Sequence, residues 1–217
     1  LKEVIETIRN GKGGANTNKS GLAFEQLTNL PDHIRRDLSN KYELKPYSIK
    51  KENRIRNSKG YSYSVFDKKK NKQIGVITRQ FQFYNVLNQL YHIKNNHHKY
   101  WKPDDAFFNT DKHTLFIVEK KYQNQPGSVD EKLFGLNAKR VIYQDLLNRQ
   151  MYEPVIPVEF IALFNSSWWH KGQILDENGQ IIKTANVDYH DYFDSLRNNG
   201  VKIMFDHYED WFLGLWR

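Results

Sequence analysis

Near the middle of the chain, residues 103–121 read PDDAFFNTDKHTLFIVEKK. Apolar and aromatic residues are concentrated in the stretches 104–109 and 114–121, and the residues between them, 110–113, are polar. Two short β-prone runs joined by a polar turn are typical of a β-hairpin. We therefore expect two antiparallel strands in this part of the chain.

The charged residues at the open end of this hairpin are expected to converge. If the hairpin is centred on its polar turn, Asp104 lies opposite Glu119, with Cβ atoms about 4.5–5.5 Å apart. Lys121 is two residues beyond Glu119, so strand alternation places it on the same face. Asp105 points to the other face and is assigned a structural role.

These residue types predict a particular chemistry. Two carboxylates that close repel each other unless a positive charge lies near both. A hard divalent cation such as Mg²⁺, for which Mn²⁺ can substitute, prefers oxygen ligands and meets this need. The ammonium group of Lys121 can hold a water beside a scissile phosphate and stabilise the negative charge that develops there. The pattern therefore predicts metal-assisted hydrolysis of a phosphodiester.

The whole chain, residues 1–217, is interpreted as a single α/β domain with a central mixed β-sheet flanked by helices. No linker rich in Pro, Gly or Ser divides it. Helical spacing of apolar residues, with local start and stop signals, predicts helices over residues 1–9, 20–27, 81–94, 128–149 and 189–199. Strands are expected within 41–80, at 160–164 and at 201–205, with a hairpin at 173–183 and a loop over 11–20.

Composition narrows the classes of partner. Lys and Arg number 33 against 25 Asp and Glu, and the net charge of +8 favours a polyanion such as nucleic acid. The absence of Cys excludes disulfides, thiolate zinc sites and cysteine nucleophiles. No apolar run reaches the roughly 18–20 residues of a membrane-spanning helix, and residues 1–10 lack the apolar core of a signal peptide. We expect a cytoplasmic, bacterial protein with no membrane partner.

The pattern Pro103-Asp104, fourteen further residues and Glu119-Lys120-Lys121 resembles the signature of PD-(D/E)XK nucleases, in particular type II restriction endonucleases. The resemblance covers the core from about residue 20 to 165 and implies a restriction-endonuclease-like fold. It implies that Asp104 and Glu119 bind Mg²⁺ and that the backbone carbonyl of Lys120 completes the protein ligands. Lys121 would be the catalytic lysine.

The same resemblance assigns roles outside the central motif. Glu25, on the helix expected before the hairpin, would be a further catalytic residue that contacts the metal through water. Gln123 matches a glutamine found near the site in some members. Ser128 and Lys132 belong to a segment that looks like the loop and helix that follow the motif in several restriction enzymes. These three residues are candidate DNA contacts.

By this resemblance the protein would be a type II restriction endonuclease that hydrolyses phosphodiester bonds at a specific sequence in double-stranded DNA. It would use Mg²⁺ and leave 5′-phosphate and 3′-hydroxyl ends. Two cuts in a palindrome require two active sites, so a homodimer is expected. Two alternatives stay open. One is another PD-(D/E)XK DNA nuclease, acting in repair or on junctions, and the other is a DNA-binding protein without catalysis, whose carboxylates are structural.

A second stretch combines aromatic and basic residues, namely Trp168, Trp169, His170 and Lys171. It follows an apolar run expected to be a buried strand and precedes the hairpin at 173–183. On an exposed loop, such side chains stack on nucleotides or read base edges. This interpretation predicts DNA contacts here, and a lid over the core or a dimer contact is the alternative.

Overall fold

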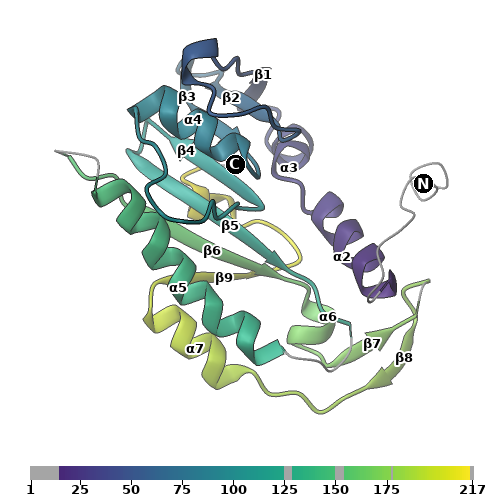
Figure 1. Ribbon diagram of the computed structural model, residues 1–217. Coiled ribbons are helices and arrows are strands. Elements are labelled where there is room, and N and C mark those ends of the chain that lie inside the picture. The colour runs from purple at the N-terminus through teal and green to yellow at the C-terminus, as the bar shows by residue number, and fades with distance from the viewer. Residues whose placement is uncertain (1–14, 125–128, 150–153, 177, 216–217) are drawn as a thin grey trace.

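The computed structural model describes residues 15–124, 129–149, 154–176 and 178–215. These residues form a seven-stranded mixed sheet flanked by helices, which confirms the predicted α/β class (Figure 1). The strands lie in the order β1 (Tyr42–Pro46), β2 (Ser62–Asp67), β3 (Lys72–Thr78), β4 (Asp105–Asn109), β5 (Thr114–Lys121), β6 (Val158–Phe164) and β9 (Val201–Phe205). A separate hairpin consists of β7 (Gln173–Leu175) and β8 (Ile181–Thr184).

Helices connect and cover these strands. The α-helices are α2 (Ala15–Leu27), α3 (Leu30–Asp37), α4 (Gln82–Tyr91), α5 (Val129–Asn148), α6 (Ser166–Trp169) and α7 (His190–Asn198), and two short 3-10 helices are η1 (Lys51–Asn53) and η2 (Asp210–Leu213). Helices α4, α5 and α7 confirm the predictions at 81–94, 128–149 and 189–199 within a few residues. The helix predicted at residues 1–9 lies outside the described residues.

The sheet changes its direction of pairing at β5. Strands β1 to β5 pair antiparallel to one another, whereas β5, β6 and β9 are parallel. Parallel neighbours require crossover connections, and α5 crosses from β5 to β6. Helices α5 and α7 lie side by side on one face of the sheet (Figure 1). Since β4 runs antiparallel to β5, the start of β4 lies beside the end of β5.

The two faces of the sheet carry separate apolar cores. Phe108 and Ile117 belong to the core beneath α4, α5 and α7. Phe107 and Val118, their neighbours along β4 and β5, belong to the core that contains α3 and the C-terminal segment. Each fully buried side chain of this kind stabilises the fold by about 1.5–3 kcal/mol. Burial on both faces explains why these strands are nearly continuous apolar runs rather than alternating ones.

The β4–β5 hairpin has the register that the sequence predicts. Asp105 pairs with Val118, which places the preceding residue, Asp104, level with Glu119. Glu119 continues the row of side chains that faces α5, because residues two apart share a face of a strand. The register therefore directs the acidic residues of the motif toward α5 and directs Asp105 to the opposite side.

One local expectation is wrong, and one helix was not predicted. Residues 15–20 are helical rather than part of a loop, because α2 begins at Ala15. Helix α3 is also not among the predicted helices, although its start carries clear signals. The Asn29 side chain accepts a hydrogen bond of 3.1 Å from the backbone N–H of Asp32, and Pro31 lies in the first turn, where its missing N–H leaves no bond unmade.

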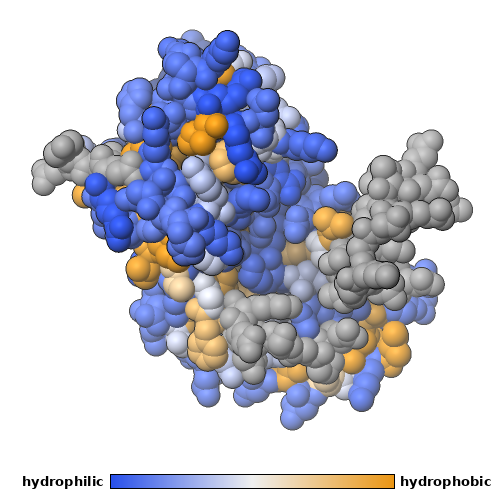
Figure 2. All heavy atoms as spheres, in the orientation of Figure 1, coloured by the Kyte–Doolittle hydropathy of each residue, from blue (hydrophilic) through white to orange (hydrophobic). Residues whose placement is uncertain are grey.

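The helices and the visible surface of the described residues bear on the expectation about membranes. No helix there is both long enough and apolar enough to cross a bilayer. On the face shown in Figure 2, hydrophilic side chains predominate and apolar ones occur in small, separate groups. Ile181 and Ile182 on β8 are among the exposed apolar side chains.

Close approach of β3 to β4 at Gly75 leads to a first prediction. A Cβ atom at Gly75 would lie 2.1 Å from the carbonyl oxygen of Phe108, so the backbone would have to move. We expect Gly75→Ala to lower the free energy of unfolding by about 1–3 kcal/mol, measured by urea denaturation. Gly135→Ala is the control, since a Cβ there meets nothing within 4 Å and alanine favours the helix. Equal destabilisation by both changes would contradict the close approach.

Candidate active site

Asp104, Glu119 and Lys121 come together at one edge of the sheet. Glu119 and Lys121 end the row of β5 side chains that faces α5, and Asp104 directly precedes β4. The Nζ atom of Lys121 donates to the Glu119 carboxylate at 3.0 Å and to the Lys120 carbonyl at 3.2 Å. The Asp104 carboxylate accepts a hydrogen bond of 2.8 Å from the backbone N–H of Lys120. The central residues predicted from the motif are therefore neighbours.

The pKa of Asp104 is shifted by its burial and by the charged groups around it. Burial is the main reason that the pKa of Asp104 is raised from 3.8 to about 6, and the negative charge of Glu119 is the second. The charge of Glu25 also raises this pKa. Lys121 and the backbone N–H of Lys120 lower it, but not enough to cancel the other effects. Burial and the neighbouring acids thus disfavour the charged form of Asp104, and the lowering groups offset this only in part.

Glu119 is almost fully buried, and only one of its carboxylate oxygens is satisfied. Its Oε2 atom accepts from Lys121 at 3.0 Å and from Lys139 of α5 at 2.5 Å. Its Oε1 atom is also shielded from solvent and has no hydrogen-bond partner among the described residues. An unsatisfied buried oxygen of this kind is costly and therefore unusual. It marks a position where a further positive group would be stabilising.

Lys139 is a site residue that the sequence analysis missed. It lies twenty residues after Glu119 and reaches it because α5 packs across this face of the sheet (Figure 1). Tyr143 lies one turn further along α5, and burial, followed by the charge of Glu119, raises its pKa well above the ordinary value. The spacing of Lys139 and Tyr143 places both on one side of the helix. This spacing is the sequence signal that could have pointed to Lys139 as a site residue.

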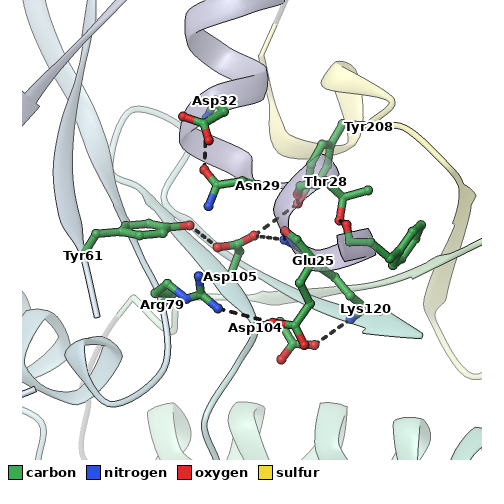
Figure 3. A network of polar contacts seen from close by, with 11 residues as sticks. Glu25, Thr28, Asn29, Asp32, Tyr61, Arg79, Asp104, Asp105, Lys120 and Tyr208 are labelled. Carbon is green, nitrogen blue, oxygen red and sulfur yellow. Dashed lines mark hydrogen bonds and ion pairs between the residues drawn. The ribbon is translucent and has the colours of Figure 1, made fainter. Parts of the chain in front are cut away.

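Asp105 and Lys120 form a buried ion pair on the opposite face of the hairpin (Figure 3). The Nζ atom of Lys120 is 2.6 Å from Asp105, and both side chains are nearly inaccessible to solvent. The Tyr61 hydroxyl donates to the Asp105 carboxylate, and the Tyr208 hydroxyl lies 3.3 Å from it. Burial, and then the charge of Asp105, raise the pKa of both tyrosines well above the usual value, so both remain protonated. The satisfied network agrees with a structural role for Asp105.

Glu25 lies close to the site but is held by an arginine. Its Oε2 atom is 3.4 Å from Arg79, which follows β3, and Figure 3 shows this pair beside Asp104. The backbone carbonyl of Glu25 lies 3.4 Å from Nζ of Lys120, its hydrogen-bond donor. α2 is thus linked to the hairpin through Lys120 and to the end of β3 through Arg79. Arg79 is a second residue near the site that the sequence analysis did not include.

The oxygen atoms at this edge fit a hard divalent cation. Within the described ranges, no three His, Cys, Asp or Glu side chains gather as ligands for one metal ion. A cation would instead be held by the carboxylates of Asp104 and Glu119 and the backbone carbonyl of Lys120, with water completing its shell. The Glu119 oxygen without a partner among the described residues is a donor of the kind that a hard divalent cation prefers.

The exposed loop expected for Trp168 and Trp169 is wrong, which removes the structural basis of their predicted DNA contact. They belong to helix α6 and are only 1% and 3% exposed. The ring of Trp169 packs against Phe164, with ring centroids 5.0 Å apart, and both tryptophans are part of the core under α7. Their position agrees with the alternative interpretation, in which these residues cover the core. His170 and Lys171 follow α6 and are exposed.

The remaining predicted DNA contacts are Gln123, Ser128 and Lys132. Gln123 is buried, and its backbone exchanges two hydrogen bonds of 2.8 Å with the side chain of Asn165. This places Gln123 in the support of the strand ends rather than on the surface, and its contact with DNA stays a prediction. Ser128 and the side chain of Lys132 lie outside the described residues.

Comparison of the chain with models of protein families, with curated proteins and with solved structures found no match. The chemistry of this protein must therefore be inferred from its own side chains. Those at the sheet edge are acidic, basic and partly buried, a combination that is found at functional sites more often than elsewhere.

The pKa of Asp104 predicts how stability depends on pH. Folding raises this pKa from 3.8 to about 6, so the stability contributed by the group is complete below pH 4 and is lost as the pH rises through 6. Asp104→Asn keeps an oxygen that can accept from Lys120 but removes the charge. In EDTA at pH 8 we expect it to raise the free energy of unfolding by about 1–3 kcal/mol, with no gain at pH 4.

Asp111→Asn is a control for which the opposite change in the free energy of unfolding is expected. Hydrogen bonds from Lys70 and Lys72 lower the pKa of Asp111 to about 2, so the loss of its charge should destabilise the protein at pH 8. Urea unfolding at both pH values measures the two variants. A destabilising Asp104→Asn at pH 8 in EDTA would contradict the crowding of charge at the site.

Lys139 is expected to oppose the binding of a divalent cation. Its ammonium group lies 2.5 Å from Glu119, so it repels a second cation at the same carboxylate. Lys139→Met keeps a long apolar side chain and should bind Mn²⁺ about tenfold more tightly than the wild type, as measured by calorimetry without DNA. Lys202→Met is the control. Lys202 pairs at 2.9 Å with Glu159, which lies near the start of β6 and away from the candidate site. Unchanged affinity in Lys139→Met would place the cation elsewhere.

Proposed function

We propose that this protein is a Mg²⁺-dependent DNA endonuclease of the PD-(D/E)XK type. The observation that carries the proposal is the convergence of Asp104, Glu119 and Lys121, with one buried Glu119 oxygen that lacks a partner among the described residues. The net charge of +8 supports a polyanionic substrate. A finer proposal, a type II restriction endonuclease that cleaves a specific duplex as a homodimer, rests on the resemblance of the motif and its context.

Asp104, Glu119 and the carbonyl of Lys120 would hold the metal. When bound, Mg²⁺ neutralises negative charge on the phosphate and acts as a Lewis acid toward it. The protein contributes the fixed position of the two carboxylates, since the backbone N–H of Lys120 holds the Asp104 carboxylate at 2.8 Å. The protein thus prepares the position at which a phosphate can bind.

With respect to the described residues, Lys121 has one hydrogen-bond donor left for the reaction. An ammonium group has three N–H donors, and two of those on Lys121 are directed to Glu119 and to the carbonyl of Lys120. The third would orient the attacking water or bind a non-bridging phosphate oxygen. Its positive charge, with that of Lys139 from α5, would stabilise the negative charge that develops on the phosphate in the transition state.

The buried Asp105–Lys120 pair would act as a positioning element for this chemistry. The side chain of Lys120 is fixed by Asp105 at 2.6 Å, while its backbone N–H and carbonyl face Asp104 and Lys121. Removal of one partner of such a pair leaves an unpaired buried charge, which costs about 3–5 kcal/mol. The ion pair on one face thus fixes the backbone that the other face uses.

Variants at the carboxylates and the lysine test the proposed activity. We expect Asp104→Ala, Glu119→Gln and Lys121→Ala to reduce the rate of Mg²⁺-dependent cleavage of a supercoiled plasmid by at least about a hundredfold. Binding to duplex DNA in Ca²⁺ should persist in all three. Glu43→Gln is a matched control, because Glu43 is exposed on β1, far from β5 in the strand order, and pairs with Lys45.

The same assays separate the alternatives. A wild-type protein that binds DNA but leaves it intact in both Mg²⁺ and Mn²⁺ would be a DNA-binding protein without catalysis. Cleavage of branched DNA but not of any linear duplex would assign it to junction or repair nucleases. Discrete fragments from a plasmid of known sequence would support the restriction endonuclease.

A further inference from the structure

An open hollow of about 640 Å³ lies beside the candidate active site. Its lining comes from three separate parts of the chain, namely residues 56–61, residues 79–81 and Lys102. Its charged lining residues are Arg56, Lys59, Arg79 and Lys102, and no acidic side chain lines it. We call it the basic groove. Its volume is within the range of sites that bind small molecules or a part of a larger one.

The basic groove lies at the same edge of the sheet as the carboxylates. Residues 56–61 precede β2, residues 79–81 follow β3 and Lys102 comes shortly before β4. Ser62 pairs with Thr78, and Thr78 pairs with Ala106, so these three strand ends are level with one another. A backbone hydrogen bond of 2.9 Å from Gln80 to Pro103 joins the groove to the residue before Asp104. The groove therefore continues the edge on which the candidate site lies.

Two of the basic side chains are held in place by aromatic rings. The guanidinium group of Arg56 lies 3.9 Å from the ring centroid of the buried Phe81. That of Arg79 lies 5.8 Å from the ring of Tyr61 and is also bound by Glu25. Stacking on a ring orients a guanidinium group without neutralising its charge. Arg56 thus remains available to an anion in a fixed orientation, whereas Arg79 shares its charge with Glu25.

Apart from Arg79, which pairs with Glu25, the charges of the groove are not compensated by ion pairs among the described residues. Among the described residues, Arg56, Lys59 and Lys102 form no ion pair, and all three are exposed. Gly60 lets the loop lie directly against the end of β3, because a Cβ atom there would lie 2.5 Å from the carbonyl oxygen of Arg79. Several uncompensated positive charges in one hollow attract a ligand with several negative charges.

We propose that the basic groove binds the phosphodiester backbone of the strand that is cut, on one side of the scissile bond. This inference rests on the proposed nuclease function and adds the direction in which the strand leaves the site. Arg79 connects the two parts, since it lines the groove and contacts Glu25, whose charge acts on Asp104. A chain of phosphates matches a row of basic residues that continues from the carboxylates better than a single small anion does.

The salt dependence of DNA binding tests the proposal. Binding of a fluorescent duplex to the full chain is measured in Ca²⁺ by anisotropy, at several salt concentrations. The double variant Lys59→Ala/Lys102→Ala should bind about tenfold to a hundredfold more weakly at low salt. The slope of log affinity against log salt should fall by roughly 1.8, because each lost phosphate contact removes about 0.9.

Lys69→Ala/Lys112→Ala is the matched control. Lys69 and Lys112 are exposed in the turns after β2 and after β4, at the opposite ends of these strands from the groove. This variant loses the same charge, so an affinity and a slope near those of the wild type are expected. If the groove variant and this control weaken binding equally, the groove is not a binding site for the strand, and the effect is one of net charge.

The remaining outcomes separate this inference from the proposed function. A wild-type protein that binds no nucleic acid overturns both. A wild-type protein that binds DNA without cleaving it overturns the nuclease, while the slopes still decide the groove. Displacement of the duplex by micromolar pyrophosphate from the wild type but not from the groove variant would assign the groove to a small phosphate ligand and overturn the proposal.

Discussion

The pairing of β4 with β5, in which Asp105 lies opposite Val118, determines what each charged residue at this edge of the sheet can reach. Because side chains alternate, Glu119 points toward α5 while Lys120 points toward Asp105 and α2. A slip of one residue would exchange the two faces. It would turn the Asp105–Lys120 pair toward the core under α5 and remove the Glu119 carboxylate from Lys139. The strongly apolar rows on either side of the hairpin oppose such a slip, since each row fits its own core.

The candidate site is electrostatically unfavourable for the fold, and its neighbours only partly correct this. Asp104 is half-buried, and its desolvation, followed by the charge of Glu119, raises its pKa to about 6. Lys121 and Lys139 both bind the same oxygen of Glu119 and leave the other without a partner among the described residues. Sites that bind or react often carry such a cost in stability. By contrast, Asp105 on the opposite face is fully satisfied by its hydroxyl and ammonium neighbours, as expected of a group that only supports the structure.

Local patterns in the sequence predict most of the strands, the helix α5 and the register of the hairpin, because each depends on residues close together in the chain. They predict the approach of Asp104, Glu119 and Lys121 for the same reason. Lys139 was not predicted because its reach depends on how α5 packs over the sheet, and the basic groove depends on three strand ends that meet only in the folded sheet. For Trp168 and Trp169, the neighbouring polar and basic residues suggested a loop, but aromatic packing against α7 and β6 prevails.

Most of the basic groove and most of the carboxylate site come from different parts of the chain. The groove draws on residues between Arg56 and Lys102, whereas Asp104, Glu119, Lys121 and Lys139 lie further along, and Glu25 comes before the groove. Mutation within residues 56–61 or at Lys102 can therefore reshape the surface beside the reacting group while Asp104, Glu119 and Lys121 stay intact. In evolutionary terms, such a layout lets selectivity diverge among descendants that keep the same chemistry, and it offers an engineer a natural boundary for exchanging one property without the other.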